Sequence, residues 1–370
     1  DDFITLRSTV EGSGSDNAQQ TGVKSIEGAG EHPIDFWIDF KGTIPEGATP
    51  RCVIVRVRYH NYTCEHDIFV RQGYAPITIN GNAESNNNPA WTSYNVYRFD
   101  ANNAPVYTKS PLEEGSLFRR GNRTAILASN NDRSGFTFGV EPTGSFNVLE
   151  FGSATTSQKT WSQLAPSTDD VTNRFKEWSI AGDHERIATI EDFYTLESTS
   201  IHSNINKAYG VLYGDGATET QKSVKEAFGY DHNEDPTNSK KGMRGCFVFN
   251  VNNSRNIFFP IGKSGYGRRK GMTSNGEKVG TLRYAQRTDY YNNDGTGNIQ
   301  YVPLFYDLFE RPGAIYQCRN RLESTNNEVK NSSAFDINYF TMGFEGFENG
   351  ASNNNNGSDS DACFIRTVKY

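Results

Sequence analysis

Alternating apolar and polar positions mark several segments of the chain as β-strands. The clearest is Cys52–Tyr59, where every second residue is apolar and Arg56 and Arg58 fall between. The positions expected to face inward are Val53, Val55, Val57 and Tyr59. A turn at His60-Asn61 and a return strand over Tyr62–Val70 complete a predicted β-hairpin.

A different period appears near the middle of the chain, in His184–Leu196. Apolar residues recur there at helical spacing, Thr189 precedes them as a candidate N-cap, and two acidic residues follow in the first turn. The pattern predicts an amphipathic helix from Ile190 to about Ser198, with Arg186 in an extended lead-in. The pattern predicts a structural element and gives no evidence for a catalytic or binding role of the helix.

Weaker patterns place the remaining elements. Helices are predicted over Asp169–Ile180 and Gln221–Phe228, and a glycine-rich turn over Tyr209–Gly216. Strands are predicted over Ile77–Ile79, Trp91–Phe99, Leu117–Ala128, Phe136–Val140, Phe146–Phe151, Gly245–Val251, Arg255–Pro260, Thr281–Ala285, Gly313–Cys318, Ala334–Phe344 and Cys363–Val368. We therefore expect a mainly β protein: a β-sandwich-like unit over residues 1–80 with an irregular lead-in, a polar linker at 81–90, and an α+β domain over 91–370.

Composition narrows the class of protein. Only 35% of the 370 residues are hydrophobic while 13% are aromatic, and the net charge is −7 without a long basic run, so nucleic acid is not an expected partner. No apolar run is long enough to cross a bilayer.

The chain has five cysteines and no C-x-x-C pair. This odd count argues against a dense disulfide framework and against a structural zinc site, although one disulfide bridge stays open. The low charge and the abundance of Asn, Gly and Tyr are typical of secreted proteins at bacterial cell surfaces.

Five segments, in this order, carry a resemblance to a family. They are Gly115–Phe118 with Gly121-Asn122, Arg186–Thr189 with Glu191 and Leu196, Ile257–Pro260 followed by Gly265-Tyr266, Gly313–Tyr316, and Phe364–Lys369. Together they resemble the Fibrobacter succinogenes major paralogous domain, found in Bacteroidales surface proteins and related to the formylglycine-generating enzymes. The resemblance implies a C-type-lectin-like fold for residues 91–370. The resemblance also implies that an Ig-like module precedes this domain, as in predicted adhesins and fimbrial tip proteins.

The chain departs from the family pattern at three motif positions. Ala188 stands where proline is usual, Gln317-Cys318 replaces a Trp-Ser pair, and Thr367 replaces a terminal cysteine. We expect the motif residues to build the fold and not to act in catalysis.

Enzymatic alternatives have little support in the residues. An oxidase of the formylglycine-generating type needs reactive thiolates close together, and Cys318 and Cys363 lie on separate predicted strands. A close, solvent-reachable pair would favour that chemistry, whereas burial of both would argue against it. Neither a G-x-S-x-G elbow nor an H-E-x-x-H helix occurs. We therefore expect no enzyme.

Metal binding has two candidate settings. His60, Cys64 and His66 fall on one face if the hairpin strand includes all three, but a fourth ligand is lacking. Calcium suits a lectin-like fold, and oxygen-rich loops occur at Asp231–Asp235, Asn292–Gly295 and Asp359–Asp361. Solvated loops are the favoured explanation of these sequences, so no cofactor is expected, and calcium stays open.

The strongest binding candidate is the loop Arg287–Tyr301, which follows a predicted strand. Glycan sites combine an aromatic platform with side chains that hydrogen-bond hydroxyl groups, and this loop with the nearby Lys263–Lys270 supplies both. The predicted ligand-binding residues are Tyr266, Arg268, Tyr290, Tyr291, Asn292, Asn293, Asp294 and Asn298.

The expected function is non-enzymatic adhesion outside the bacterial cell, by recognition of a glycan or a protein, at the tip of a fimbria. One alternative is a structural pilus subunit without a ligand pocket, whose partners are other pilus subunits. An exposed, unpaired sheet edge on the N-terminal unit would favour that class. The other alternative is an enzyme related to the formylglycine-generating oxidases.

Overall fold

A computed structural model shows that the chain is mainly β, as the sequence predicts. It describes residues 3–11, 19–26, 36–111, 113–119, 122–128, 144–164, 180, 184–196, 204–213, 243–260, 313–319, 334–338, 342–344 and 362–370. The chain divides into two compact units: Asp1–Ala75 with Asn253–Arg255, and Pro76–Asn252 with Asn256–Tyr370.

Unit 1 contains two antiparallel sheets. Strand β1 (Ile4–Glu11) lies between β2 (Gln19–Val23) and β3 (Phe36–Phe40), and β4 (Arg51–Tyr59) pairs with β5 (Cys64–Gln72). The side chains that the two sheets bury together are Phe3, Ile4 and Val70, with Ile38, Val53, Val55 and Ile68 packed against them. Burial of these side chains is what holds the small unit together.

The β4–β5 hairpin confirms the alternation seen in the sequence, because Val53 and Val55 do face the core. Two details of the prediction are wrong. The turn spans four residues, His60–Thr63, closed by a hydrogen bond from the Thr63 amide to the His60 carbonyl (3.1 Å). Tyr59 is 40% exposed because the hairpin extends beyond the core that covers its base.

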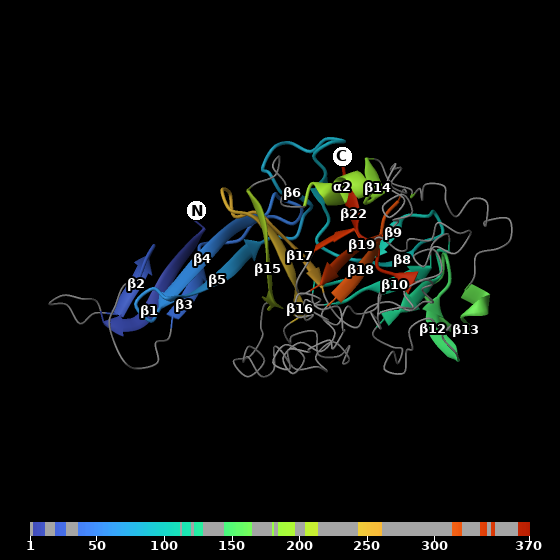
Figure 1. The fold of residues 1–370 in the computed structure, drawn as a ribbon, viewed down its shortest axis with the longest axis horizontal. Coiled ribbons are helices and arrows are strands. Elements are labelled where there is room, and N and C mark those ends of the chain that lie inside the picture. Colours follow the sequence, from blue (N-terminus) through green and yellow to red (C-terminus); the bar gives the residue numbers. More distant parts are fainter. Residues whose placement is uncertain are drawn as a thin grey trace, which may run out of the picture. The chain divides into compact units, whose positions relative to one another are not determined.

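Unit 2 is built around two larger sheets (Figure 1). The five-stranded sheet has the order β13 (Thr156–Thr160), β12 (Ser145–Leu149), β11 (Ala125–Leu127), β10 (Ser116–Arg119), β21 (Ala362–Cys363). The four-stranded sheet has the order β14 (Glu185–Ile187), β22 (Thr367–Lys369), β7 (Ala90–Trp91), β6 (Ile77–Thr78). The last residues of the sequence therefore complete both sheets.

Smaller sheets accompany these two. They are β15 (Ile205–Leu212), β16 (Met243–Asn250) and β17 (Asn256–Pro260); β18 (Gly313–Gln317), β19 (Ala334–Asn338) and β20 (Met342–Phe344); and the pair β8 (Val96–Phe99) and β9 (Pro105–Tyr107). A short 3-10 helix, η2 (Ser162–Leu164), follows β13. One core cluster joins several of these elements: Val96, Phe99, Phe118, Ala125, Leu127, Leu149, Ile187 and Ile365.

The central helix forms where the sequence predicts it to start, as α2 (Ile190–Tyr194). Thr189 is the N-cap, and its side chain and that of Asp192 exchange hydrogen bonds with each other's backbone amides in a capping box. The helix is shorter than predicted, since Thr195 already caps its C-terminal end. Arg186 lies in the extended strand β14, as expected.

Three boundary predictions need correction. Ile77–Ile79 belongs to unit 2, where β6 pairs with β7, and does not close the first unit. The predicted turn at Tyr209–Gly216 begins too early, because Tyr209–Leu212 continues strand β15. Residues 81–90 are more than a linker: Asn88 donates to the Ala83 carbonyl (2.8 Å), and Arg186 bonds both the side chain and the carbonyl of Asn86 (3.0 Å each).

The predicted strands at Phe136–Val140 and Thr281–Ala285 and the predicted helix at Gln221–Phe228 lie outside the described residues, as does nearly all of Asp169–Ile180.

Candidate functional site

The residues predicted to bind a ligand lie outside the part of the chain that the structure describes. This holds for Tyr266, Arg268, Tyr290, Tyr291, Asn292, Asn293, Asp294 and Asn298, and equally for the three oxygen-rich loops considered for calcium.

The proposed metal face on the β4–β5 hairpin does not form. His60 lies in the turn with φ of 51° and not on a strand, so it cannot share a strand face with Cys64 and His66. His66 Nε2 lies 2.9 Å from the Tyr59 hydroxyl. Among the described residues, no group of three or more His, Cys, Asp or Glu side chains could hold a metal ion.

No disulfide joins any of the five cysteines, all of which lie in the described residues, so the bridge that the sequence left open is not present. Cys318 and Cys363 are each 1% exposed, and solvent does not reach this pair. Burial raises the pKa of the Cys246 thiol to about 12, which keeps it protonated and unreactive. The structure thus offers no exposed thiol pair of the kind that an oxidase would need.

The segments that carried the family resemblance meet in the core of unit 2. Arg366 is fully buried and donates to the Asn95 side chain (2.8 Å) and to the carbonyls of Thr92 (2.8 Å) and Phe258 (3.1 Å). Its guanidinium also lies 4.8 Å from the centre of the Phe259 ring. Arg366 is therefore a structural residue that ties distant segments together.

A residue outside the motif segments, Asn95, connects this centre with two motif residues, Tyr316 and Gly115. The Asn95 amide donates to the Glu114 carbonyl (2.7 Å) and to the Tyr316 hydroxyl (3.2 Å). Gly115 has φ of +95°, and a Cβ there would lie 2.7 Å from Asn95 Cβ, so glycine is needed at this close approach. These motif positions build the fold, as the sequence indicated.

A second polar cluster surrounds Glu185 at the edge of the four-stranded sheet. Its carboxylate accepts hydrogen bonds from the hydroxyls of Tyr107 and Thr367, the latter at 2.9 Å, and Lys369 is its cross-strand neighbour. Burial raises the pKa of Glu185, and the Thr367 hydrogen bond and the Lys369 charge oppose this only in part. Both hydroxyl groups donate to the Glu185 carboxylate. The cluster therefore connects strands β9, β14 and β22, which carry Tyr107, Glu185 and Thr367.

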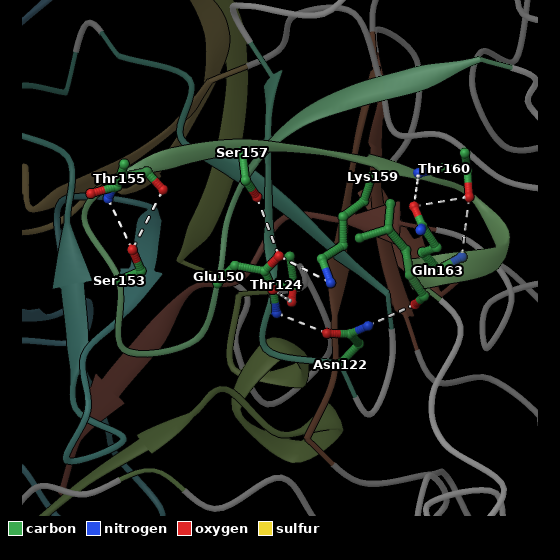
Figure 2. A network of polar contacts seen from close by, with 10 residues as sticks. Asn122, Thr124, Glu150, Ser153, Thr155, Ser157, Lys159, Thr160 and Gln163 are labelled. Carbon is green, nitrogen blue, oxygen red and sulfur yellow. Dashed lines mark hydrogen bonds and ion pairs between the residues drawn. The ribbon is translucent and has the colours of Figure 1, made fainter.

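A third polar group, which we call the Glu150 network, lies on the β12–β13 hairpin and is partly open to solvent (Figure 2). Glu150 accepts a hydrogen bond from Ser157 (3.2 Å), forms an ion pair with Lys159 (3.0 Å), and accepts from Thr124 on its other oxygen (3.3 Å). The side chains of Lys159 and Glu150 are 32% and 36% exposed. We define the network as Thr124, Glu150, Ser157 and Lys159.

The local sequence explains why this network is ordered. Asn122 holds Thr124 by accepting from its amide (2.8 Å), and Asn122 donates to the Leu164 carbonyl (2.7 Å) at the end of η2. The next strand residue, Thr160, is fixed by Gln163, whose side chain accepts from the Thr160 amide (2.8 Å). Side chains held by neighbours in this way are pre-organised, so little conformational entropy is lost when they contact a ligand.

Hydroxyl, amide, carboxylate and ammonium groups thus line the edge of the five-stranded sheet. Every residue of β13 is polar, and within the described residues no strand pairs with its outer edge. Phe151, which follows Glu150 in the sequence, is 46% exposed. An exposed aromatic ring together with fixed donors and acceptors is the set of groups that binds hydroxyl-rich molecules.

Sequence reasoning missed this site. The segment Thr156–Thr160 lacks apolar alternation, because this edge strand has polar side chains on its half-buried face as well as on its exposed face. The available signal was the string of Ser and Thr around Glu150 together with Phe151 after a strand.

No protein-family model matches the chain, and no curated protein or solved structure matches it either. Among the described residues, no helix is long and apolar enough to cross a membrane.

Proposed function

We propose that the protein is a non-enzymatic adhesin that recognises a glycan at the bacterial cell surface, through the Glu150 network and Phe151. The observation that carries the proposal is the partly exposed, pre-organised set of donors and acceptors around Glu150, which an exposed aromatic residue, Phe151, follows in the sequence. Sugars present hydroxyl groups that both donate and accept, together with an apolar C–H face. The network and the ring match these two properties.

The C-type-lectin-like fold of residues 91–370 and the Ig-like nature of the preceding unit are part of the proposal. They are supported by the convergence of the motif segments on Arg366 and by the two packed antiparallel sheets of unit 1. The loop Arg287–Tyr301 remains a second proposed contact of the same function, with its site at Tyr290 and Tyr291.

Calcium is not required in this proposal. Both carboxylate oxygens of Glu150 are engaged by an ammonium or a hydroxyl group, so they are not arranged as ligands for a hard cation. Glycan binding should therefore be equal in calcium and in chelator.

A glycan array of the full chain tests the proposal. Glu150→Gln removes the charge that orders Ser157 and Lys159, and Phe151→Ala removes the ring, so each variant should bind a positive glycan about tenfold more weakly or worse. Glu65→Gln is the matched control, because Glu65 is also an ion-paired and partly exposed glutamate but lies in unit 1.

The same array separates the two proposed contacts. Loss of binding in Tyr290→Ala/Tyr291→Ala, with Glu150→Gln unaffected, would move the site to the Arg287–Tyr301 loop. A silent array with the unaltered chain would contradict glycan recognition and favour a protein ligand. Circular dichroism of each variant shows whether it is folded.

A structural subunit that assembles through strand pairing is a second candidate, because within the described residues of unit 1 no strand pairs with the outer edge of β3. The two functions use different residues and are compatible in one chain.

A further inference from the structure

The segment that follows strand β6 contains an asparagine directly before a glycine, Asn80-Gly81. Both residues are exposed, and so is the next one, Asn82. Gly81 has a φ of 88°, a backbone conformation that suits glycine and few other residues, so the turn requires glycine here. Glycine also has no side chain that would hinder its own backbone nitrogen in an attack on the asparagine side chain. The pair therefore combines an accessible amide with a nitrogen that is free to approach it.

Hydrogen bonding holds the Asn80 side chain beside that nitrogen. The side-chain oxygen of Asn80, Oδ1, accepts a hydrogen bond from the Asn82 amide (2.9 Å). The bond closes a small ring that contains the peptide group between Asn80 and Gly81. The Gly81 amide itself has no hydrogen-bond acceptor among the described residues. Two reacting groups held together in this way react far faster than the same groups on separate molecules.

The Asn82 amide lies where negative charge develops in such a reaction. When a nitrogen attacks the side-chain carbonyl carbon of Asn80, charge moves onto Oδ1, which is the atom that accepts from Asn82. A backbone N–H group already aimed at this oxygen stabilises the transition state, as donors do at the oxyanions of acyl transfer. The turn thus supplies both the nucleophile and the donor.

We propose that Asn80 is a site of spontaneous modification, at which the Gly81 nitrogen converts the side-chain amide into a cyclic imide. The Gly81 nitrogen gives its proton to solvent and forms a bond to the side-chain carbonyl carbon of Asn80. The side-chain nitrogen takes a proton from water and leaves as ammonia. Water then opens the imide at either of its two C–N bonds, which yields an aspartate or an isoaspartate at position 80. No oxidation or reduction takes place, and water is the only other reactant.

Both products change the connection between strands β6 and β7. The Thr78 hydroxyl donates to the Asn82 carbonyl (2.6 Å), and this hydrogen bond spans the reacting pair. Aspartate places a new negative charge inside the span. Isoaspartate adds a methylene group to the main chain there, while Ile79, directly before the pair, is buried and only 3% exposed. The modification therefore alters both the charge and the length of a segment that is fixed at both ends.

Peptide mapping of the full chain by mass spectrometry tests the proposal. Trypsin releases residues 72–98 as one peptide, because Arg71 and Arg98 flank a stretch without lysine or arginine. After incubation at mildly alkaline pH in water enriched in heavy oxygen, position 80 should carry a heavy oxygen atom, as aspartate and as isoaspartate. Asn82 is the internal control: it is also exposed but precedes Ala83, and it should keep its amide.

Two variants and an unfolded sample separate the parts of the mechanism. Asn80→Gln should abolish the conversion, because the longer side chain would have to form a larger ring. Asn82→Pro keeps the Asn-Gly pair but removes the donor to Oδ1, so the conversion should slow about tenfold or more. The unaltered chain should convert at least as fast when folded as in urea, where the donor is not held in place.

Three results would overturn the proposal. They are equal conversion of Asn80 and Asn82, an unchanged rate in Asn82→Pro, and slower conversion in the folded chain than in urea. The comparison in urea uses the unaltered sequence, so it decides the matter even if Asn82→Pro does not fold.

Discussion

Arg366 is a charged residue that the sequence pattern could not place. It follows Phe364-Ile365 and precedes Thr367, and nothing local shows that its partners are a side chain and two carbonyls far away in the sequence. Its guanidinium satisfies three acceptors in the core, and a buried acceptor left without a donor costs about 1–3 kcal/mol. The local periodicity of a sequence does not show hydrogen bonds between residues that are this far apart.

Replacing Arg366 by methionine should therefore lower the free energy of unfolding by about 3 kcal/mol or more, measured by urea denaturation. Arg366→Lys should recover only part of the loss, because an ammonium cannot reproduce the planar fork of donors. The control is Arg58→Ala: Arg58 is 48% exposed and its ion pair with Glu65 is worth less than about 1 kcal/mol. Equal losses for Arg366→Met and Arg58→Ala would contradict a structural role.

Glu185 gives a prediction about pH. Its pKa is raised above the ordinary 4.5, chiefly by burial, so the folded protein favours the protonated form. The resulting stability is fully present below pH 4.5 and is lost as the pH rises through the folded-state pKa. Glu185→Gln keeps an oxygen that accepts from Tyr107 and Thr367 but cannot ionise. The variant should be more stable than the unaltered chain at pH 7, and this advantage should shrink towards pH 4. A difference in stability between Glu185→Gln and the unaltered chain that does not change with pH would contradict this prediction.

At the scale of elements, predictions succeeded where the signal was local. The β4–β5 hairpin follows from alternation, and the start of α2 follows from Thr189 and the acidic residues behind it. The end of α2 was missed because apolar spacing continues beyond Tyr194, although the backbone stops being helical there. The pairing of β22 with β14 and β7 could not be predicted, because the periodicity of a sequence does not show which distant strands pair.

The capping box of α2 should contribute more to the free energy of unfolding than the length of this helix suggests. Thr189→Ala should cost about 1 kcal/mol and Thr189→Ser should be nearly neutral. Asp192→Ala should cost about 3–5 kcal/mol, because it also removes the bond to the Thr189 amide (2.8 Å) and leaves Arg186 without its bidentate partner (2.7 and 3.0 Å). Chemical denaturation measures all three. A loss for Asp192→Ala no larger than that for Thr189→Ala would show that the ion pair adds nothing.

At the scale of the whole molecule, the position of the boundary between the units can be tested. The sequence favours a domain that begins at residue 91, whereas the contacts place Pro76 at the start of unit 2. Ile77 and Ile79 are 1% and 3% exposed there, and burying two such side chains is worth roughly 3–5 kcal/mol. A fragment from Pro76 to Tyr370 should be more stable than one from Trp91 by about this amount in urea denaturation. Equal stability of the two fragments would restore the sequence-based boundary.

The position of β22 between β14 and β7 has a consequence for the order of events during synthesis. Residues 367–369 are the strand that both neighbours need, so the four-stranded sheet cannot be assembled until residue 369 has left the ribosome. Contacts between such distant segments slow folding, because a long loop must be closed before any pairing is gained. During that interval Trp91, which is fully buried in the folded protein, lacks the strand that pairs with it. The nascent chain therefore passes through a period in which a chaperone would find this large apolar side chain without its folded-state neighbour.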